Sequence, residues 1–128
     1  MNGSSLTLAG LVGLAGALGA LARYSVGRLV AEQTKSTFPW GTLLINVSGA
    51  FVIGLIAGLV SAKVLNTTLQ AVLATGFLGG YTTFSTMSWE TVQLFRSGGR
   101  AQGLLYIAGN FVPGLLAAAL GLVLGGLF

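Results

Sequence analysis

The stretch that decides the fold is GFLGGYTTFSTMSWE, residues 76–90. It begins inside an apolar run of the kind that crosses a lipid bilayer, and it then places Gly79 and Gly80 side by side. Six hydroxyl-bearing residues follow within positions 81–88, and the stretch ends on the carboxylate of Glu90. Glycine, β-branched and short polar residues are weak helix formers. The stretch therefore predicts a helix that is broken near Gly79–Thr83.

The rest of the chain is suited to a membrane rather than to water. Hydrophobic residues make up 54% of the 128 positions and charged residues only 6%, whereas soluble domains carry about 25% charged residues. Four apolar stretches, at about 6–22, 42–62, 69–94 and 103–128, compare with the roughly 20 residues that a helix needs to cross a bilayer. We therefore predict an all-α integral membrane protein with one domain, residues 1–128, and four transmembrane helices of which the third is broken.

The residue types that are absent exclude several functions. The sequence has no Cys and no His, which removes disulfides, thiolate and imidazole metal ligands, and the commonest general base. We expect no enzymatic activity, because no nucleophile–base pair remains. The six basic residues are scattered without interleaved aromatic residues, so the net charge of +4 indicates contact with lipid headgroups and not with nucleic acid.

Small residues recur at helical spacing in three of the apolar stretches. Stripes of this kind let helices approach closely in lipid. They fit packing within one chain and packing between chains equally well. The stripes are Ala9, Gly13, Gly16 and Ala20; Gly54 and Gly58; and Gly114, Ala118, Gly121 and Gly125.

Polar groups within the apolar stretches indicate a path for a small ion. Irregular backbone is tolerated at membrane depth only where protein buries it or where it lines a cavity. Carbonyls freed at the break would suit Na⁺, and the alternative is a plain kink satisfied by Ser and Thr side chains. Beyond the break, hydrogen-bond donors dominate, and the positive edges of Phe rings add to them, so a small anion fits better than a cation. The donors are Asn46, Thr82, Thr83, Ser85, Thr86, Ser88, Tyr106 and Asn110.

Two charged residues, Glu90 and Arg23, are also candidates to act on an ion in this path. Glu90 lies four positions after Thr86 on one helix face and is placed to orient the hydroxyl protons toward an ion. Arg23, at the end of the first apolar stretch, either reaches to the membrane interface or attracts anions into a vestibule.

Three segments resemble the Fluc (CrcB) family of fluoride channels, and the resemblance covers essentially the whole chain. They are GALGALARY at 16–24, WGTLLINVSG at 40–49 and TGFLGGYTTFSTMSWET at 75–91, of which the last is highly specific. The resemblance implies passive fluoride export across the plasma membrane of a bacterium, which lowers cytoplasmic fluoride. It also implies an antiparallel dual-topology dimer with two fluoride pores and a structural Na⁺ at the dimer centre that is not transported.

The resemblance also assigns roles to positions of this chain. It implies that backbone carbonyls of Gly79 and Thr82 hold the Na⁺ and that Arg23 lies in a vestibule. Two positions depart from the family pattern, because Met87 replaces the second Phe of TTFSTFS and Asn110 stands where some relatives have Ser. The fluoride pathway that the resemblance implies consists of Asn46, Phe84, Ser85, Thr86, Met87, Ser88, Glu90, Tyr106 and Asn110.

The distribution of loop charges leaves the pairing of chains open. The first and third links share one side of the membrane and carry an excess of basic residues, whereas a dual topology favours little bias. We predict a homodimer, with a pair formed by this chain and an oppositely oriented relative as the alternative. The charges concerned are Arg28, Lys35, Arg96 and Arg100 against Glu32 on one side and Lys63 on the other.

Two other functions compete with the channel. A small dual-topology multidrug exporter needs a membrane carboxylate exposed to a lipophilic cation, typically early in the chain, whereas Glu90 is late and surrounded by donors. A structural membrane subunit would explain the glycine stripes and leave the hydroxyls without a role.

Overall fold

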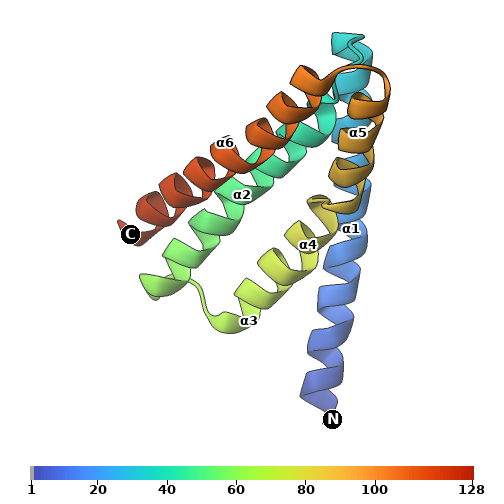
Figure 1. Ribbon diagram of the computed structural model, residues 1–128. Helices are drawn as coiled ribbons and strands as arrows, with labels where there is room; N and C mark the ends of the chain where they lie inside the picture. The colour runs from blue at the N-terminus through green and yellow to red at the C-terminus, as the bar shows by residue number, and fades with distance from the viewer. Residues whose placement is uncertain (1) are drawn as a thin grey trace.

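The structure is a computed structural model that describes residues 2–128, and within that range it contains helices and no strands (Figure 1). Three helices are long and apolar enough to cross a membrane, namely α1, α2 and α6. The all-α membrane class predicted from composition is confirmed. In chain order the elements are α1 (Gly3–Thr34), α2 (Trp40–Ser61), α3 (Thr67–Gln70), the π-helix η1 (Ala71–Leu78), α4 (Gly79–Tyr81), α5 (Ser85–Arg96) and α6 (Arg100–Gly126).

Helix α1 is longer than its apolar stretch. It begins at an N-cap, because the Asn2 side chain accepts the N–H of Ser5 at 2.9 Å. It continues beyond residue 22 to Thr34, so Arg23 lies within the helix rather than at its end. An ion pair between Arg28 Nε and Glu32 Oε1, at 3.1 Å and four residues apart, supports the polar last turns.

The break in the third segment lies slightly beyond the glycine pair. Gly79 and Gly80 are both helical, and the first extended residue is Thr82, with φ −77° and ψ 157°. Helix α5 then starts afresh at Ser85. Figure 1 shows α5 leaving the line of α4 at this point. The predicted break is therefore present, and it occupies positions 82–84.

The glycines before the break serve close packing on α1. A Cβ on Gly80 would collide with the carbonyl oxygen of Gly16, and a Cβ on Gly19 would collide with that of Phe77. Backbone thus meets backbone where α1 crosses η1 and α4, an approach that side chains would prevent. Of the glycine pair, only Gly80 makes this contact, since a Cβ on Gly79 would meet nothing closer than 3.9 Å, and both glycines remain helical.

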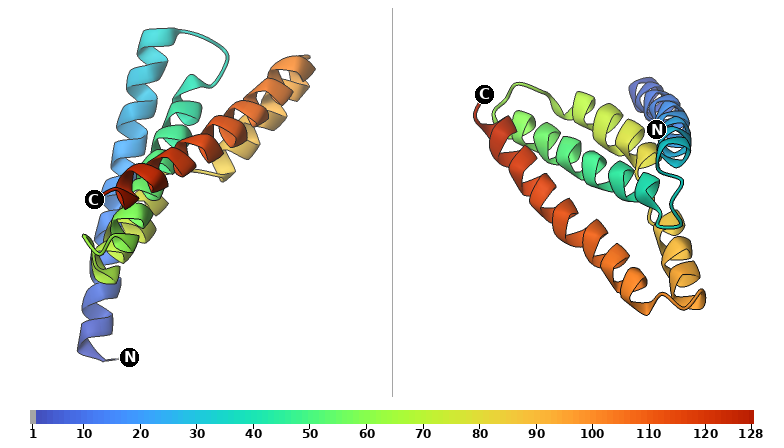
Figure 2. Two further views of the ribbon diagram at one scale, coloured as in Figure 1. Left: turned by 90° about the vertical axis from the view of Figure 1, so that its left-hand side faces the viewer. Right: turned by 90° about the horizontal axis from the view of Figure 1, so that it is seen from above.

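Helices α2 and α6 lie side by side along most of their length (Figures 1 and 2). A Cβ on Gly54 would meet the carbonyl of Ala118, and one on Gly121 would meet that of Phe51. Gly58 and Gly125 are equally close to the opposite backbone. The small-residue stripes of the second and fourth apolar stretches are therefore used largely within the chain. Helix α6 continues as one helix through Pro113.

Large apolar side chains cover the outside of the bundle. Leu14 is 67% exposed on α1 and Leu115 is 70% exposed on α6. Within the described chain the fully buried side chains are few, with Tyr106 and Ile45 the largest. Such an outside is stable against lipid tails or a second chain and not against water.

Two glycines of α6 provide a matched test of this packing. We expect Gly121→Ala to lower the free energy of unfolding by about 1–3 kcal/mol, because its methyl group would overlap the α2 backbone. Gly114→Ala should be neutral or slightly stabilising, since a Cβ there meets nothing within 4 Å. Denaturant unfolding in detergent micelles measures both. Equal effects of the two substitutions would contradict the packing described here.

Candidate functional site at the helix break

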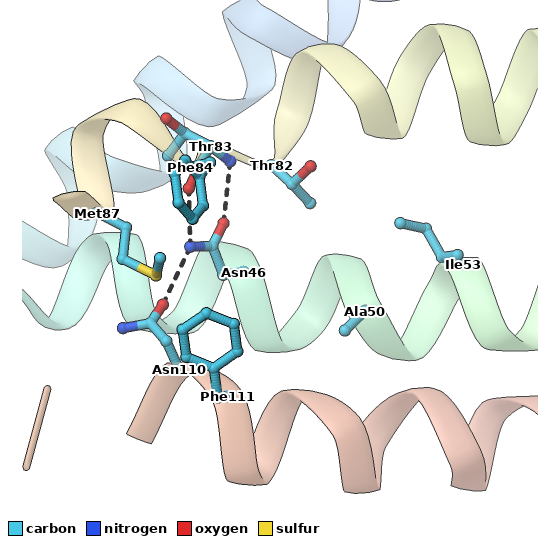
Figure 3. A pocket seen from close by; sticks show the side chains of 9 residues that line it. All are labelled: Asn46, Ala50, Ile53, Thr82, Thr83, Phe84, Met87, Asn110 and Phe111. Carbon is cyan, nitrogen blue, oxygen red and sulfur yellow. Dashed lines mark hydrogen bonds between the residues drawn. The ribbon is translucent and has the colours of Figure 1, made fainter. Parts of the chain in front are cut away.

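The side chain of Asn46, in the second turn of the apolar helix α2, holds the backbone of the break. Its Oδ1 accepts the N–H of Thr83 at 3.0 Å, and its Nδ2 donates to the carbonyl of the same residue at 3.0 Å (Figure 3). A single amide therefore satisfies both backbone groups of one residue. Two facing residues on neighbouring antiparallel β-strands exchange the same pair of N–H···O hydrogen bonds.

This pairing frees a carbonyl upstream. In a continuous helix the N–H of Thr83 would donate to the carbonyl of Gly79, four residues back. It donates to Asn46 instead, so the Gly79 carbonyl has lost its helical donor. The carbonyl of Thr82 has lost its donor as well, because the N–H of Thr86 turns to the hydroxyl of Thr83, at 3.1 Å. Both residues that the sequence singled out for Na⁺ thus carry carbonyls without their helical partners.

The hydrogen bonds continue from Asn46 into α6 and back to α5. Asn46 Nδ2 donates to Asn110 Oδ1 at 3.0 Å, and Asn110 Nδ2 donates to the carbonyl of Tyr106 at 2.9 Å. The Tyr106 hydroxyl donates to Glu90 Oε1 at 3.0 Å. Tyr106 is fully buried, with the ring of Phe38 edge-on at 5.5 Å. The chain of bonds therefore reaches helix α5 at Glu90 and the break before it at Thr83.

A cavity of about 290 Å³ opens beside this network (Figure 3). Asn46 and Asn110 supply amides to its wall, and Met87 supplies a buried thioether. Phe84 is 72% exposed at its edge. The sequence analysis named these four residues as pathway residues, and the structure brings them together. The lining of the cavity also includes Ala50, Ile53, Thr82, Thr83 and Phe111.

The hydroxyls of α5 do not form one continuous ladder. The Ser88 hydroxyl donates back to the carbonyl of Phe84 at 2.9 Å, which is the ordinary habit of Ser in membrane helices. Ser85 and Thr86 are exposed, and within residues 2–128 their hydroxyls make no hydrogen bond. The hydroxyl hydrogens of Ser85 and Thr86 thus have no acceptor among residues 2–128, whereas the Ser88 hydroxyl donates within its own helix.

Thr83 has a structural role that its place among the predicted hydrogen-bond donors did not indicate. It is buried, its backbone is held by Asn46, and its hydroxyl caps the start of α5 by accepting the Thr86 N–H. Its signal in the sequence was its position, three residues before Thr86 at the head of a new helix, which is the spacing of an N-cap.

Arg23 and Glu90 lie at other hollows. Arg23 lines a cleft of about 420 Å³ together with Thr83 and Thr86, so the start of α5 separates this cleft from the cavity at the break. Glu90 lines two further clefts, of about 270 and 340 Å³, which include Thr37 and Pro39 from the link between α1 and α2. The residues expected along the path thus line several separate hollows, and they come from α1, α2, α5 and α6.

Among residues 2–128 no group of three or more His, Cys, Asp or Glu side chains could hold a metal ion. The oxygens at the break are backbone carbonyls, hydroxyls and the amide oxygens of Asn46 and Asn110. These are hard oxygen ligands, which suit alkali and alkaline-earth ions.

Comparison with known proteins gives one consistent answer. The family described as "CrcB-like protein, Camphor Resistance (CrcB)" matches residues 10–122. The "Fluoride-specific ion channel FluC 2" of Clostridium acetobutylicum is 41% identical over 87% of this chain and 92% of its own length. The "Fluoride-specific ion channel FluC" of Thermus thermophilus is 46% identical over 91% of this chain and 93% of its own length. The protein of the same name from Acidobacterium capsulatum is 44% identical over 89% and 92%.

The cap formed by Thr83 can be tested by an isosteric change. Thr83→Val keeps the shape of the side chain and removes the acceptor for the Thr86 N–H, so we expect a loss of about 1 kcal/mol in the free energy of unfolding. Thr83→Ser, which keeps the hydroxyl, serves as the control and should stay within about 0.5 kcal/mol of the parent. Denaturant unfolding in micelles decides, and a Val variant as stable as the Ser variant would show that the cap contributes nothing.

Proposed function

Because the chain belongs to the CrcB family, we propose that it is a fluoride-specific ion channel of the plasma membrane. The observation that carries the proposal is that relatives bearing this name match the chain over about nine-tenths of its length. The channel provides passive export of fluoride, which lowers its concentration in the cytoplasm.

The side chains at the break favour an anion over a cation. The amides of Asn46 and Asn110 and the ring of Phe84 line the cavity of about 290 Å³ there, and no acidic side chain does so. The Asn110 amide hydrogen that has no acceptor among residues 2–128, together with the positive edge of Phe84, offers an anion contacts that replace part of its hydration shell. Glu90 belongs to the clefts beyond, where the Tyr106 hydroxyl holds its carboxylate.

The same contacts favour a channel over the two other candidate functions. A multidrug exporter requires a carboxylate open to a lipophilic cation, but Glu90 accepts the Tyr106 hydroxyl and is only partly exposed. A purely structural subunit has no use for a polar cavity at membrane depth, since burying amides there is costly. We also infer that the protein is not an enzyme, because the relatives that it matches are named ion channels.

The broken third segment is proposed as the fourth membrane crossing. It runs from α3 through η1 and α4 to α5, and its pieces are individually too short to span a bilayer. Two such chains would pair as an antiparallel dimer, a homodimer in preference to a pair with an oppositely oriented relative. The exposed apolar side chains of α1 and α6 support pairing of this kind.

A structural Na⁺ at the dimer centre fits the residues present. The carbonyls of Gly79 and Thr82 have lost their helical donors, and Gly79 is exposed on the surface of the single chain. Two chains related by a twofold axis would bring four such oxygens to one point. The ion would supply positive charge at the end of α4, where helix carbonyls gather.

Efflux from liposomes tests the proposed function. Vesicles that contain the purified protein should release fluoride rapidly and chloride at a rate close to that of empty vesicles, because the relatives that this chain matches are named fluoride-specific channels. Ion-selective electrodes measure both anions. Equal release of chloride and fluoride, or release of neither, would contradict the proposal.

Substitution at Met87 tests the wall of the cavity. Met87 is 7% exposed and packs near Leu94 and Tyr106. We expect Met87→Phe to keep fluoride flux within about threefold of the parent, because the exchange roughly conserves volume and the cavity provides space for the ring. Met87→Ala is the contrasting variant and should lose about 2–5 kcal/mol of stability. An inactive Phe variant that is correctly assembled would show that the thioether itself is required.

A further inference from the structure

We propose that Asn46 is a positioning residue, whose amide holds the backbone of the break in place instead of presenting its N–H groups to the ion. The inference rests on the proposed fluoride function and concerns how this one side chain serves it. It differs from the role that the family resemblance implies, in which Asn46 belongs to the lining of the fluoride path.

The orientation of the Asn46 amide is set by the backbone that it meets. The N–H of Thr83 needs an acceptor, and Asn46 Oδ1 provides it at 3.0 Å. The amide nitrogen therefore faces the carbonyl of Thr83, at 3.0 Å. With the opposite orientation, donor would face donor and acceptor would face acceptor at once.

Both hydrogens of the Asn46 amide are then committed. One goes to the Thr83 carbonyl, and the other goes to Asn110 Oδ1 at 3.0 Å. The acceptor at Asn110 is itself oriented, because its Nδ2 donates to the Tyr106 carbonyl at 2.9 Å. An anion at Asn46 would have to displace one of these bonds. Asn110, in contrast, keeps one amide hydrogen without an acceptor among residues 2–128.

The bonds of Asn46 determine the shape of the break. They take the Thr83 N–H away from the Gly79 carbonyl and hold the peptide of Thr83 on α2. The Thr83 hydroxyl can then accept the Thr86 N–H and start helix α5 in a new direction. Figure 3 shows Asn46 between Thr83 above and Asn110 below, with the cavity beside all three. The amide thus sets where Phe84 and Met87 stand in the cavity wall.

Hydrogen exchange combined with fluoride efflux separates a positioning residue from a ligand. In Asn46→Ala, we expect the backbone amides of residues 83–86 to exchange about tenfold faster or more, because the bond that holds the Thr83 N–H is lost. Fluoride flux should fall, and the fluoride concentration for half-maximal flux should rise. A variant that merely reduced the amount of folded protein would leave that concentration unchanged.

A second variant and a control keep the test decisive. Asn110→Ala leaves the Asn46 side chain intact and releases one of its hydrogens. We expect exchange at residues 83–86 to accelerate severalfold there too, since the amide is less firmly held. Ser48→Ala removes a neighbouring bond of α2, to the Tyr81 hydroxyl at 3.1 Å, which does not involve the break. Its exchange at residues 83–86 should match the parent.

Two results would overturn the inference. Asn46→Ala with lost flux but with parental exchange at residues 83–86 would show that the amide is a ligand. Asn110→Ala with parental exchange would show that the network does not hold the break, and this variant decides if Asn46→Ala fails to assemble. The absence of fluoride flux in the unaltered protein would instead contradict the proposed function, and the exchange measurement would still decide the role of Asn46.

Discussion

The site depends on one pairing, in which the side chain of Asn46 satisfies the N–H and the carbonyl of Thr83. Lipid offers no hydrogen bonds, so a helix can end inside the bilayer only if protein groups meet its exposed backbone. One amide from α2 does this at the point where the third segment changes direction. The same pairing frees the Gly79 carbonyl and lets α5 begin at Ser85. The cavity, the cap and the proposed cation ligands all follow from it.

Two further constraints hold this arrangement in position. Glycines let the backbone of α1 pack directly against the backbones of η1 and α4, which holds the segment before the break close to α1. Beyond the break, Tyr106 holds α5 through Glu90 and is buried against Phe38. The break itself has an irregular backbone, but each neighbouring segment is packed or hydrogen-bonded. An irregular polar segment held between packed segments suits a pore, because a pore needs a polar path of fixed geometry.

Much of this architecture was readable from the sequence because the physical signals were strong. Low charge and long apolar runs indicated the membrane class, and Gly79 followed by a run of hydroxyls predicted the break. The exact place of the break was not predictable, because Gly80 is there for its contact with Gly16 and remains helical. Thr83 was named only as one hydrogen-bond donor among several, and its role at the break was missed for a related reason. Its role comes from a partner 37 positions away in the chain, Asn46, and spacing within one helix cannot reveal such a partner.

Only some of the residues proposed for the path lie next to one another in the structure. Asn46, Phe84, Met87 and Asn110 do share one cavity. Ser88 had the same composition signal as Ser85, yet its hydroxyl bonds back to its own helix. Side-chain type indicates that a donor is present, but only the fold shows whether its hydrogen is already committed.

The most direct test of the account is a high-resolution density map of the protein in lipid nanodiscs, examined at the peptide of Thr83. We predict an extended backbone at Thr82, the Asn46 amide within hydrogen-bond distance of both backbone groups of Thr83, and a Gly79 carbonyl turned away from the Thr83 N–H. A third segment that continues as an unbroken helix, with the Gly79 carbonyl bonded to the Thr83 N–H and the Asn46 amide free, would contradict it.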